Sequence, residues 1–145
     1  MTQRVTQPGA PTLPDGLVVI VKRECATCVM VAPLLGKFAT TIYTQDDPRF
    51  PEGLNAIHDE DLSISWHYDI ETVPTVLKIV DGVEVDRTFG WVSSEWQRIT
   101  GIDDLGSDLP PFRPGCGSLS VDPDRVDSLR AAFAGHVLKS RRLEL

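Results

Sequence analysis

The feature that most constrains the fold of this chain is a fully apolar run followed closely by two cysteines. Residues 17–21 (LVVIV) contain no polar side chain, which predicts a strand buried on both faces of a sheet. After a short polar turn come Cys25 and Cys28, and residues 29–38 place apolar side chains at helical spacing, with Pro33 expected to kink the helix. A strand, a turn and two cysteines at the first turn of a helix are suited to thiol-disulfide exchange.

The two cysteines are expected to take different roles. The N-terminus of a helix presents unpaired N–H groups and the positive end of the helix dipole, which favour a thiolate over a thiol. We therefore predict that Cys25 is a nucleophile near neutral pH. The two residues between the cysteines allow Cys28 to reach back and close a disulfide with Cys25.

Length and charge limit the possible classes of partner. At 145 residues and 41% hydrophobic content, the sequence predicts one globular domain with appendages. The formal charge of −7, from 21 acidic and 14 basic residues, argues against nucleic acid or an anionic membrane surface as a partner. No apolar stretch approaches the roughly 20 residues of a membrane span.

The cysteine count and the N-terminal segment bear on the compartment. Residues 1–16 are rich in proline and lack the apolar core of a signal peptide, so we expect a cytoplasmic protein. Three cysteines in a reducing compartment point to catalytic or metal-binding roles and not to a structural disulfide framework.

The rest of the pattern predicts further strands and helices. We expect strands at 40–45, 73–80 and 83–89. Two further helices are expected, one at 61–68 and one capped by Ser93. The segment 46–59 is expected to be an inserted loop, and 101–121 an irregular stretch. Asp81-Gly82 predicts a tight hairpin between the last two strands. A final helix from Asp122-Pro123 carries an apolar stripe (Val126, Leu129, Phe133, Val137), which is expected to pack back on the domain or to support a dimer.

In this order of elements the chain resembles the thioredoxin family. The resemblance depends on Cys25 and Cys28, on YDIETVPT at residues 68–75, on Asp81-Gly82 and on Phe89-Gly90-Trp91. It implies a thioredoxin-like α/β fold in three layers, α/β/α, around a central mixed sheet of four or five strands. The implied organisation is an irregular lead-in at 1–16, a thioredoxin-like domain at 17–100 and a C-terminal loop-helix extension at 101–145.

The resemblance also implies a substrate groove beside the cysteines. Pro74 would follow a cis peptide bond and lie against the cysteine pair, leaving Val73 free to pair with an extended substrate strand. Trp91 would offer an apolar contact near this groove, and it also has the character of a core residue. The implied reaction is attack by Cys25 on a substrate disulfide, followed by resolution of the mixed disulfide by Cys28.

The implied enzyme is a thiol-disulfide oxidoreductase with no cofactor beyond its own redox-active disulfide. Its partners would be a disulfide-containing protein or small molecule and an electron-donating reductase, with reduction as the net direction in the cytoplasm. Three positions depart from the family pattern: Glu24 stands where a tryptophan is usual, Ala26-Thr27 replaces Gly-Pro, and Val19 replaces a buried acid. These departures favour a dedicated partner over general thioredoxin duty.

Cys116 is the second unusual feature, because it lies between two glycines in the segment RPGCGS, outside the resemblance. Such a loop has an exposed backbone and few steric neighbours, which suits a reactive thiol. Our hypothesis is a third redox thiol that exchanges with Cys25, with Cys28 or with a partner. The alternative is a buried small hydrophobic residue.

Two other interpretations of the cysteine pair remain open at this point. In the first, the chain is a thioredoxin-like binding or accessory module whose cysteines sense redox state or handle metal. In the second, Cys25, Cys28 and Cys116 bind zinc with one histidine, although a strand followed by a helix is unlike a zinc knuckle and we predict no metal site. The histidines His58, His67 and His136 are scattered and are not expected to be catalytic.

Overall fold

Five strands form one mixed sheet in the computed structural model, which describes residues 10–134. The sheet has the order β3-β2-β1-β5-β6, with β1 (Gly16–Val21), β2 (Thr41–Thr44), β3 (Ile57–His58), β5 (Thr75–Val80) and β6 (Val83–Phe89). Strands β1, β2 and β3 are parallel to one another, whereas β5 is antiparallel to β1 and to β6. The predicted α/β class with a mixed sheet is therefore confirmed.

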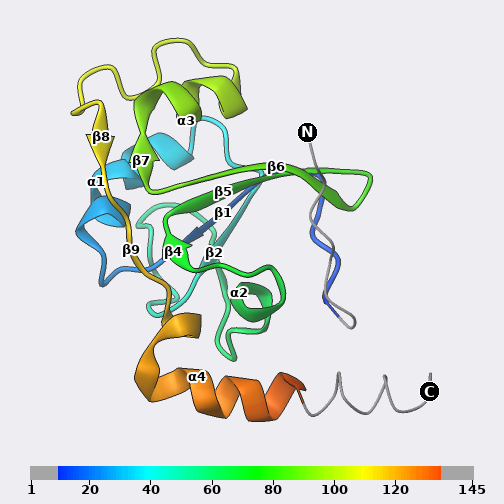
Figure 1. Ribbon diagram of the computed structural model, residues 1–145. Coiled ribbons are helices and arrows are strands. Elements are labelled where there is room, and N and C mark those ends of the chain that lie inside the picture. Colours follow the sequence, from blue (N-terminus) through cyan, green and yellow to red (C-terminus); the bar gives the residue numbers. More distant parts are fainter. Residues whose placement is uncertain (1–9, 135–145) are drawn as a thin grey trace.

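The apolar run at 17–21 forms the centre of this sheet. Residues Val18, Val19, Ile20 and Val21 are fully buried, and β1 is paired with a strand on each side. In Figure 1, helices α1 (Ala26–Leu35) and α3 (Ser93–Thr100) lie on one side of the sheet and α2 (Ser63–His67) lies on the other. The sheet is thus covered by helices on both faces, as a fully apolar strand requires.

The first helix begins and ends earlier than the sequence pattern predicts. It starts at Ala26 because Cys25 has an extended backbone and its sulfur accepts a hydrogen bond from the N–H of Cys28, as an N-cap residue does. It ends at Leu35, before Gly36. Phe38, predicted to lie in the helix, instead packs edge-on against Trp96 at a ring-centroid distance of 5.7 Å.

Four further predictions are corrected. The segment 46–59 is not all loop, since Ile57–His58 forms the edge strand β3. The strand expected at 73–80 is divided at Pro74 into β4 (Thr72–Val73) and β5. Ser93 does not cap α3: it is the first helical residue, and Val92 is the N-cap without a side-chain hydrogen bond. The helix expected at 61–68 is the shorter α2.

The hairpin at Asp81-Gly82 is confirmed. Both residues have positive φ, 53° and 76°, which is the backbone required by the type I′ turn that joins twisted strands. The carboxylate of Asp15 accepts the backbone N–H groups of both turn residues, at 3.0 and 2.9 Å. The lead-in residues just before β1 are thereby fastened to the far end of the hairpin.

The C-terminal extension is more ordered than predicted. Two short strands interrupt the stretch 101–121: β8 (Phe112–Arg113) pairs with β7 (Trp91–Val92), and β9 (Cys116–Gly117) pairs with β4. In Figure 1 this segment descends past the start of α1 and continues into a turn of 3-10 helix, Leu119–Val121. A segment distant in sequence therefore crosses the region of the two cysteines.

The final helix starts as predicted. The Asp122 side chain accepts the N–H of Asp124, and Pro123 is the first residue of α4 (Pro123–Leu129), which continues as a π-helical turn, Arg130–Ala134. Phe133 contacts the rings of Trp66 and His67, so the extension packs against α2. Val137 lies outside the described residues. Within residues 10–134 no helix is long and apolar enough to cross a membrane.

Candidate functional site

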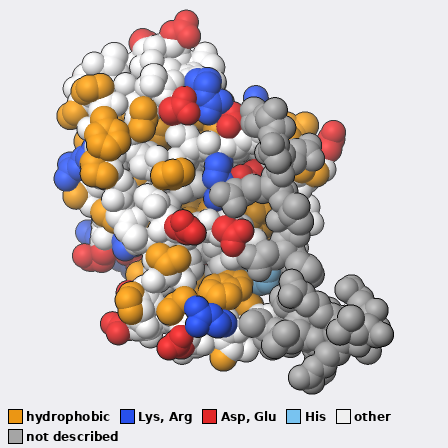
Figure 2. All heavy atoms as spheres, in the orientation of Figure 1, with side chains coloured by type: hydrophobic (Ala, Val, Ile, Leu, Met, Phe, Trp, Pro, Cys, Tyr) orange, Lys and Arg blue, Asp and Glu red, His pale blue; other side chains and the backbone are white. Residues whose placement is uncertain are grey.

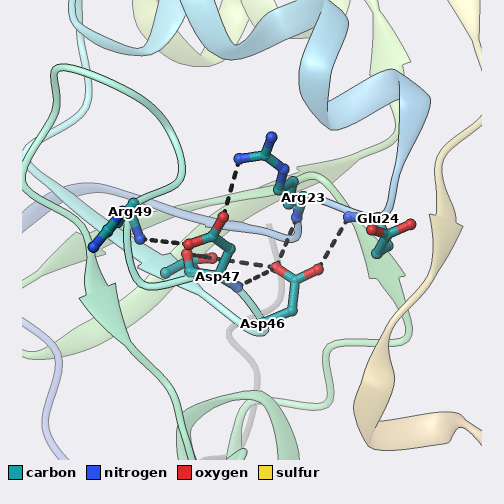
Figure 3. A network of polar contacts seen from close by, with 6 residues as sticks. Arg23, Glu24, Asp46, Asp47 and Arg49 are labelled. Carbon is teal, nitrogen blue, oxygen red and sulfur yellow. Dashed lines mark hydrogen bonds and ion pairs between the residues drawn. The ribbon is translucent and has the colours of Figure 1, made fainter.

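The turn that leads from β1 into the cysteines is fixed by one carboxylate. Asp46, which follows β2, accepts the backbone N–H groups of Arg23 at 2.7 Å and Glu24 at 3.0 Å (Figure 3). Burial of Asp46 opposes its ionisation, but these backbone N–H groups outweigh burial and hold the pKa of the carboxyl below its usual value. Asp47 adds an ion pair with Arg23 at 3.0 Å. The position of Cys25 is thus set by two adjacent parallel strands.

Cys25 and Cys28 lie together at the start of α1. The Cys25 sulfur accepts the Cys28 backbone N–H at 3.3 Å and lies 3.6 Å from the carbonyl oxygen of Val73. Cys25 is 3% exposed and Cys28 is fully buried. The two thiols are therefore in contact with each other and with the chain segment that precedes Pro74.

The surroundings of the two thiols lower the pKa of Cys25 and raise the pKa of Cys28. A hydrogen bond from Cys28 lowers the pKa of Cys25 to about 5, against the opposing effect of burial and with a further lowering by a hydrogen bond from Cys116. Burial, and then the hydrogen bond to Cys25, raise the pKa of Cys28 far above its ordinary value. The pair consequently consists of a thiolate at Cys25 and a protonated thiol at Cys28 at neutral pH.

The third cysteine belongs to the same cluster. Strand β9 runs antiparallel to β4, with Cys116 opposite Val73 and Gly117 opposite Thr72, and the N–H of Ser118 extends the ladder to the carbonyl of Glu71 at 2.9 Å. The side chains of Cys116 and Cys25 are near enough to shift each other's pKa, that of Cys25 downward and that of Cys116 upward. Partial burial, and then this contact, raise the pKa of Cys116.

Residues 112–118, which we call the strap, are held over the site by polar contacts from both sides. The Thr27 hydroxyl donates to the carbonyl of Pro114 at 2.7 Å, and the Lys22 ammonium donates to the carbonyl of Gly117 at 2.6 Å. Gly115 lies so close to β4 that a Cβ there would be 2.4 Å from the Val73 carbonyl oxygen. The strap is therefore closely fitted to the cysteine site.

The structure brings most of the predicted site residues together, with two corrections. The peptide bond between Val73 and Pro74 is cis, the state that the resemblance implies. Val73 is not free for a substrate strand, since β9 is paired with it. The glycine before Cys116 does not have few steric neighbours, because β4 packs directly against it; only Gly117 is open.

Trp91 of β7 packs into the core. Its side chain is fully buried, its indole N–H donates to the carbonyl of Pro110 at 2.6 Å, and its ring packs edge-on against Trp96 at 5.0 Å. Gly106 contacts the same ring closely. Trp91 therefore acts as a core residue and not as a substrate contact.

Sequence reasoning missed the residues that hold the strap. Thr27 stands where the family pattern has proline, and the hydroxyl that distinguishes it from proline is what binds Pro114. Gln45, just after β2, is buried and donates to the hydroxyls of Ser65 and Ser118 while accepting the N–H of Leu119. The departure from Gly-Pro was a signal for the first residue, but no sequence pattern distinguishes Gln45 from a surface glutamine.

Two other departures from the family pattern, Val19 and Glu24, lie in β1 and just after it. Val19, at the position of the missing acid, is fully buried between Ile42 of β2 and Val76 of β5. Glu24 uses its backbone N–H to bind Asp46.

The candidate metal ligands do not form a site in the described part of the chain. Among residues 10–134, no group of three or more His, Cys, Asp or Glu side chains is arranged to hold a metal ion. His67 bonds within α2 to Ser63, His58 lies in β3, and His136 falls outside the described residues. Asp59 accepts the N–H groups of Ile64 and Ser65 at the start of α2, which is a helix-capping role.

Comparison of the chain with protein-family models, with curated proteins and with solved structures gives no match.

Proposed function

We propose that this chain is a thiol-disulfide oxidoreductase with a thioredoxin-like fold, in which Cys25 is the nucleophile and Cys28 the resolving thiol. One observation carries the proposal: Cys25 is the N-cap of a ten-residue helix, and its sulfur accepts the backbone N–H of Cys28 at 3.3 Å. A low-pKa thiolate beside a protonated second thiol is the arrangement that two-step disulfide exchange needs. The mixed sheet, the cis Val73-Pro74 bond and helices on both faces support the fold assignment.

In the reducing direction, the Cys25 thiolate attacks one sulfur of a substrate disulfide. A Cys25-substrate disulfide forms, and the other substrate sulfur leaves as a thiolate and takes a proton from solvent. Cys28 then loses its proton and attacks Cys25, which releases the second substrate thiol and leaves a Cys25–Cys28 disulfide. Two electrons pass from the cysteine pair to the substrate. A reductase, or a dithiol acting as reductant, must return two electrons to the pair.

The burial of Cys28 supports its role as the resolving thiol and that of Cys25 as the nucleophile. A fully buried thiol of raised pKa does not react with solvent disulfides, but it lies next to Cys25 and attacks once Cys25 is part of a disulfide. We propose a cytoplasmic location, in which the reducing direction prevails, and a substrate that is a protein or small-molecule disulfide. We propose no metal or organic cofactor.

The proposal is tested by trapping the mixed disulfide. The variant Cys28→Ser/Cys116→Ser retains Cys25 alone and is incubated with a synthetic peptide that contains one disulfide. We expect a stable peptide adduct at Cys25, seen by intact mass and peptide mapping, and no adduct in the matched variant Cys25→Ser/Cys116→Ser. Absence of an adduct at Cys25 would contradict the proposal and favour the binding or accessory module.

A further inference from the structure

We propose that Cys116 is the internal exchange partner of Cys25 and that strand β9 acts as a built-in substrate strand, through which disulfide passes between the buried cysteine pair and the surface. This inference rests on the exchange chemistry proposed above. It adds a third catalytic thiol and identifies the strand that presents a sulfur to Cys25 as a segment of the same chain.

The first support is the register of the strap on β4. Cys116 is directly opposite Val73, and the carbonyl of Val73 lies 3.6 Å from the Cys25 sulfur. Strand addition beside a reactive group is a general way to present an extended peptide, because backbone hydrogen bonds fix its side chains in register. Pairing with Val73 therefore delivers the Cys116 sulfur to Cys25.

The second support is that Cys116 interacts differently with the sulfurs of Cys25 and Cys28. The side chains of Cys116 and Cys25 shift each other's pKa by direct interaction as well as by charge, whereas Cys116 affects the pKa of Cys28 only through charge. Cys25 is also the sulfur shared by the two steps of the exchange reaction. The geometry thus matches a disulfide that moves between two partners of one central sulfur.

The third support is access from solvent. Cys25 is 3% exposed and Cys28 is fully buried, while Cys116 is partly exposed, and the strap covers the edge of β4. An external strand cannot pair with Val73 while β9 occupies that position. Cys116 is therefore the most accessible thiol of the three.

The exchange balances without any added oxidant. Starting from a Cys25–Cys28 disulfide, the Cys116 thiol loses its proton and its sulfur attacks Cys25; the Cys25–Cys116 bond forms, the Cys25–Cys28 bond breaks, and Cys28 takes up a proton. The number of disulfides and the number of protons bound to sulfur stay the same. In the reverse step, Cys28 attacks Cys25 and releases Cys116 as a thiol.

The pKa values of Cys28 and Cys116 determine which of the two disulfides is favoured at equilibrium. A sulfur of higher pKa is the poorer leaving group, and burial raises the pKa of Cys28 more than that of Cys116. Cys116 is accordingly the group that leaves more readily. We expect the wild-type chain to rest as Cys25–Cys28 when oxidised and the Cys25–Cys116 bond to accumulate only when Cys28 is removed.

The test uses the full chain with Cys28→Ser in a buffer of about 0.1 mM oxidised and reduced glutathione. A thiol held in contact has an effective concentration at or above the millimolar range. We expect an internal Cys25–Cys116 disulfide, identified by peptide mapping, in roughly tenfold excess over glutathione bound to Cys25. Cys28→Ser/Cys116→Ser should instead carry glutathione on Cys25.

Two glycine variants test whether the strap position matters. Gly115→Ala in the Cys28→Ser background places a methyl group 2.4 Å from the Val73 carbonyl oxygen and should reduce the internal disulfide at least several-fold. Gly117→Ala is the matched control, because nothing lies within 4 Å of its added Cβ, and it should leave the yield unchanged.

The outcomes separate the two proposals. If Cys28→Ser takes glutathione on Cys25 to the same extent with and without Cys116, the internal partner is refuted while the exchange activity of Cys25 stands. If Cys25 takes up no glutathione in the double variant and forms no internal disulfide in the single variant, both proposals fail.

Discussion

The pH dependence of Cys25 reactivity tests the electrostatics of the site. The pKa of this thiol is lowered from 9.0 to about 5, with the Cys28 hydrogen bond as the largest cause. At pH 7 a thiol of pKa 9.0 is about 1% thiolate, whereas one of pKa about 5 is about 99% thiolate. The gain in reactive form is therefore roughly 100-fold at neutral pH.

The rate at a single pH does not reveal this gain. A thiolate of lower pKa is a weaker nucleophile, with a Brønsted slope of about 0.4–0.5, so a difference of about 4 in pKa lowers its intrinsic rate by about 40-fold to 100-fold. The two effects nearly cancel at pH 7. The midpoint of the rate against pH is consequently the informative quantity.

The assay follows release of pyridinethione from dithiodipyridine between pH 3.5 and 9, in the Cys116→Ser variant, so that Cys28 is the only other thiol and is buried. Because Cys116→Ser also removes a smaller pKa-lowering contact, we expect the rate to rise with pH and to level off somewhat above pH 5. Adding Cys28→Ala removes the largest pKa-lowering contact and should move the midpoint upward towards 9. A rate that still rises tenfold per pH unit between pH 6 and 8 with Cys28 present would refute the reasoning.

Three other predictions concern the strap and its support. Thr27→Val removes the hydroxyl that donates to Pro114 and keeps the side-chain shape; the loss of about 1 kcal/mol should raise the reaction rate of Cys25 with an external disulfide about fivefold, measured by stopped-flow mixing. Gln45→Leu leaves buried hydroxyl and N–H partners unpaired and should lower the free energy of unfolding by about 1–3 kcal/mol in urea titrations. Gly106→Ala and Gly53→Ala both place alanine at positive φ, but only the first meets a ring, at 2.4 Å from Trp91; it should destabilise the chain by about 1–3 kcal/mol more than the second.

Local rules predicted the parts of the fold whose signal is contained in neighbouring residues. The apolar run at 17–21 became the central strand because no polar residue interrupts it, and Asp81-Gly82 became the hairpin because both residues accept positive φ. Cys25 and Cys28 were placed at the start of α1 for the same reason: the strand, turn and helix signals are contiguous.

The elements that were missed depend on partners distant in sequence. Strands β3, β8 and β9 are two residues each, too short for a periodic pattern, and each exists because a complementary edge is available elsewhere in the chain. The pairing of Cys116 with Val73 joins residues 43 positions apart (116 minus 73), so no local signal specifies it. The sequence did single out Cys116 as a candidate redox thiol, but its position against Cys25 came only from the fold.

Exposed apolar side chains around the strap illustrate the same limit. Figure 2 shows hydrophobic side chains gathered over the region of β8 and the start of α1, and Phe112 of β8 is 61% exposed. Alternation along the sequence did not predict this exposure, since the strand that holds Phe112 was itself not predicted.

The most direct test of the account is a redox titration of the wild-type chain in defined thiol buffers, with alkylation and mass mapping of all three cysteines. The account predicts one reversible two-electron couple, Cys25–Cys28, with Cys116 remaining a thiol in the fully oxidised monomer. If all three cysteines stay reduced across the titration, or retain a metal ion that protects them from alkylation, the central claim of disulfide exchange at Cys25 is contradicted.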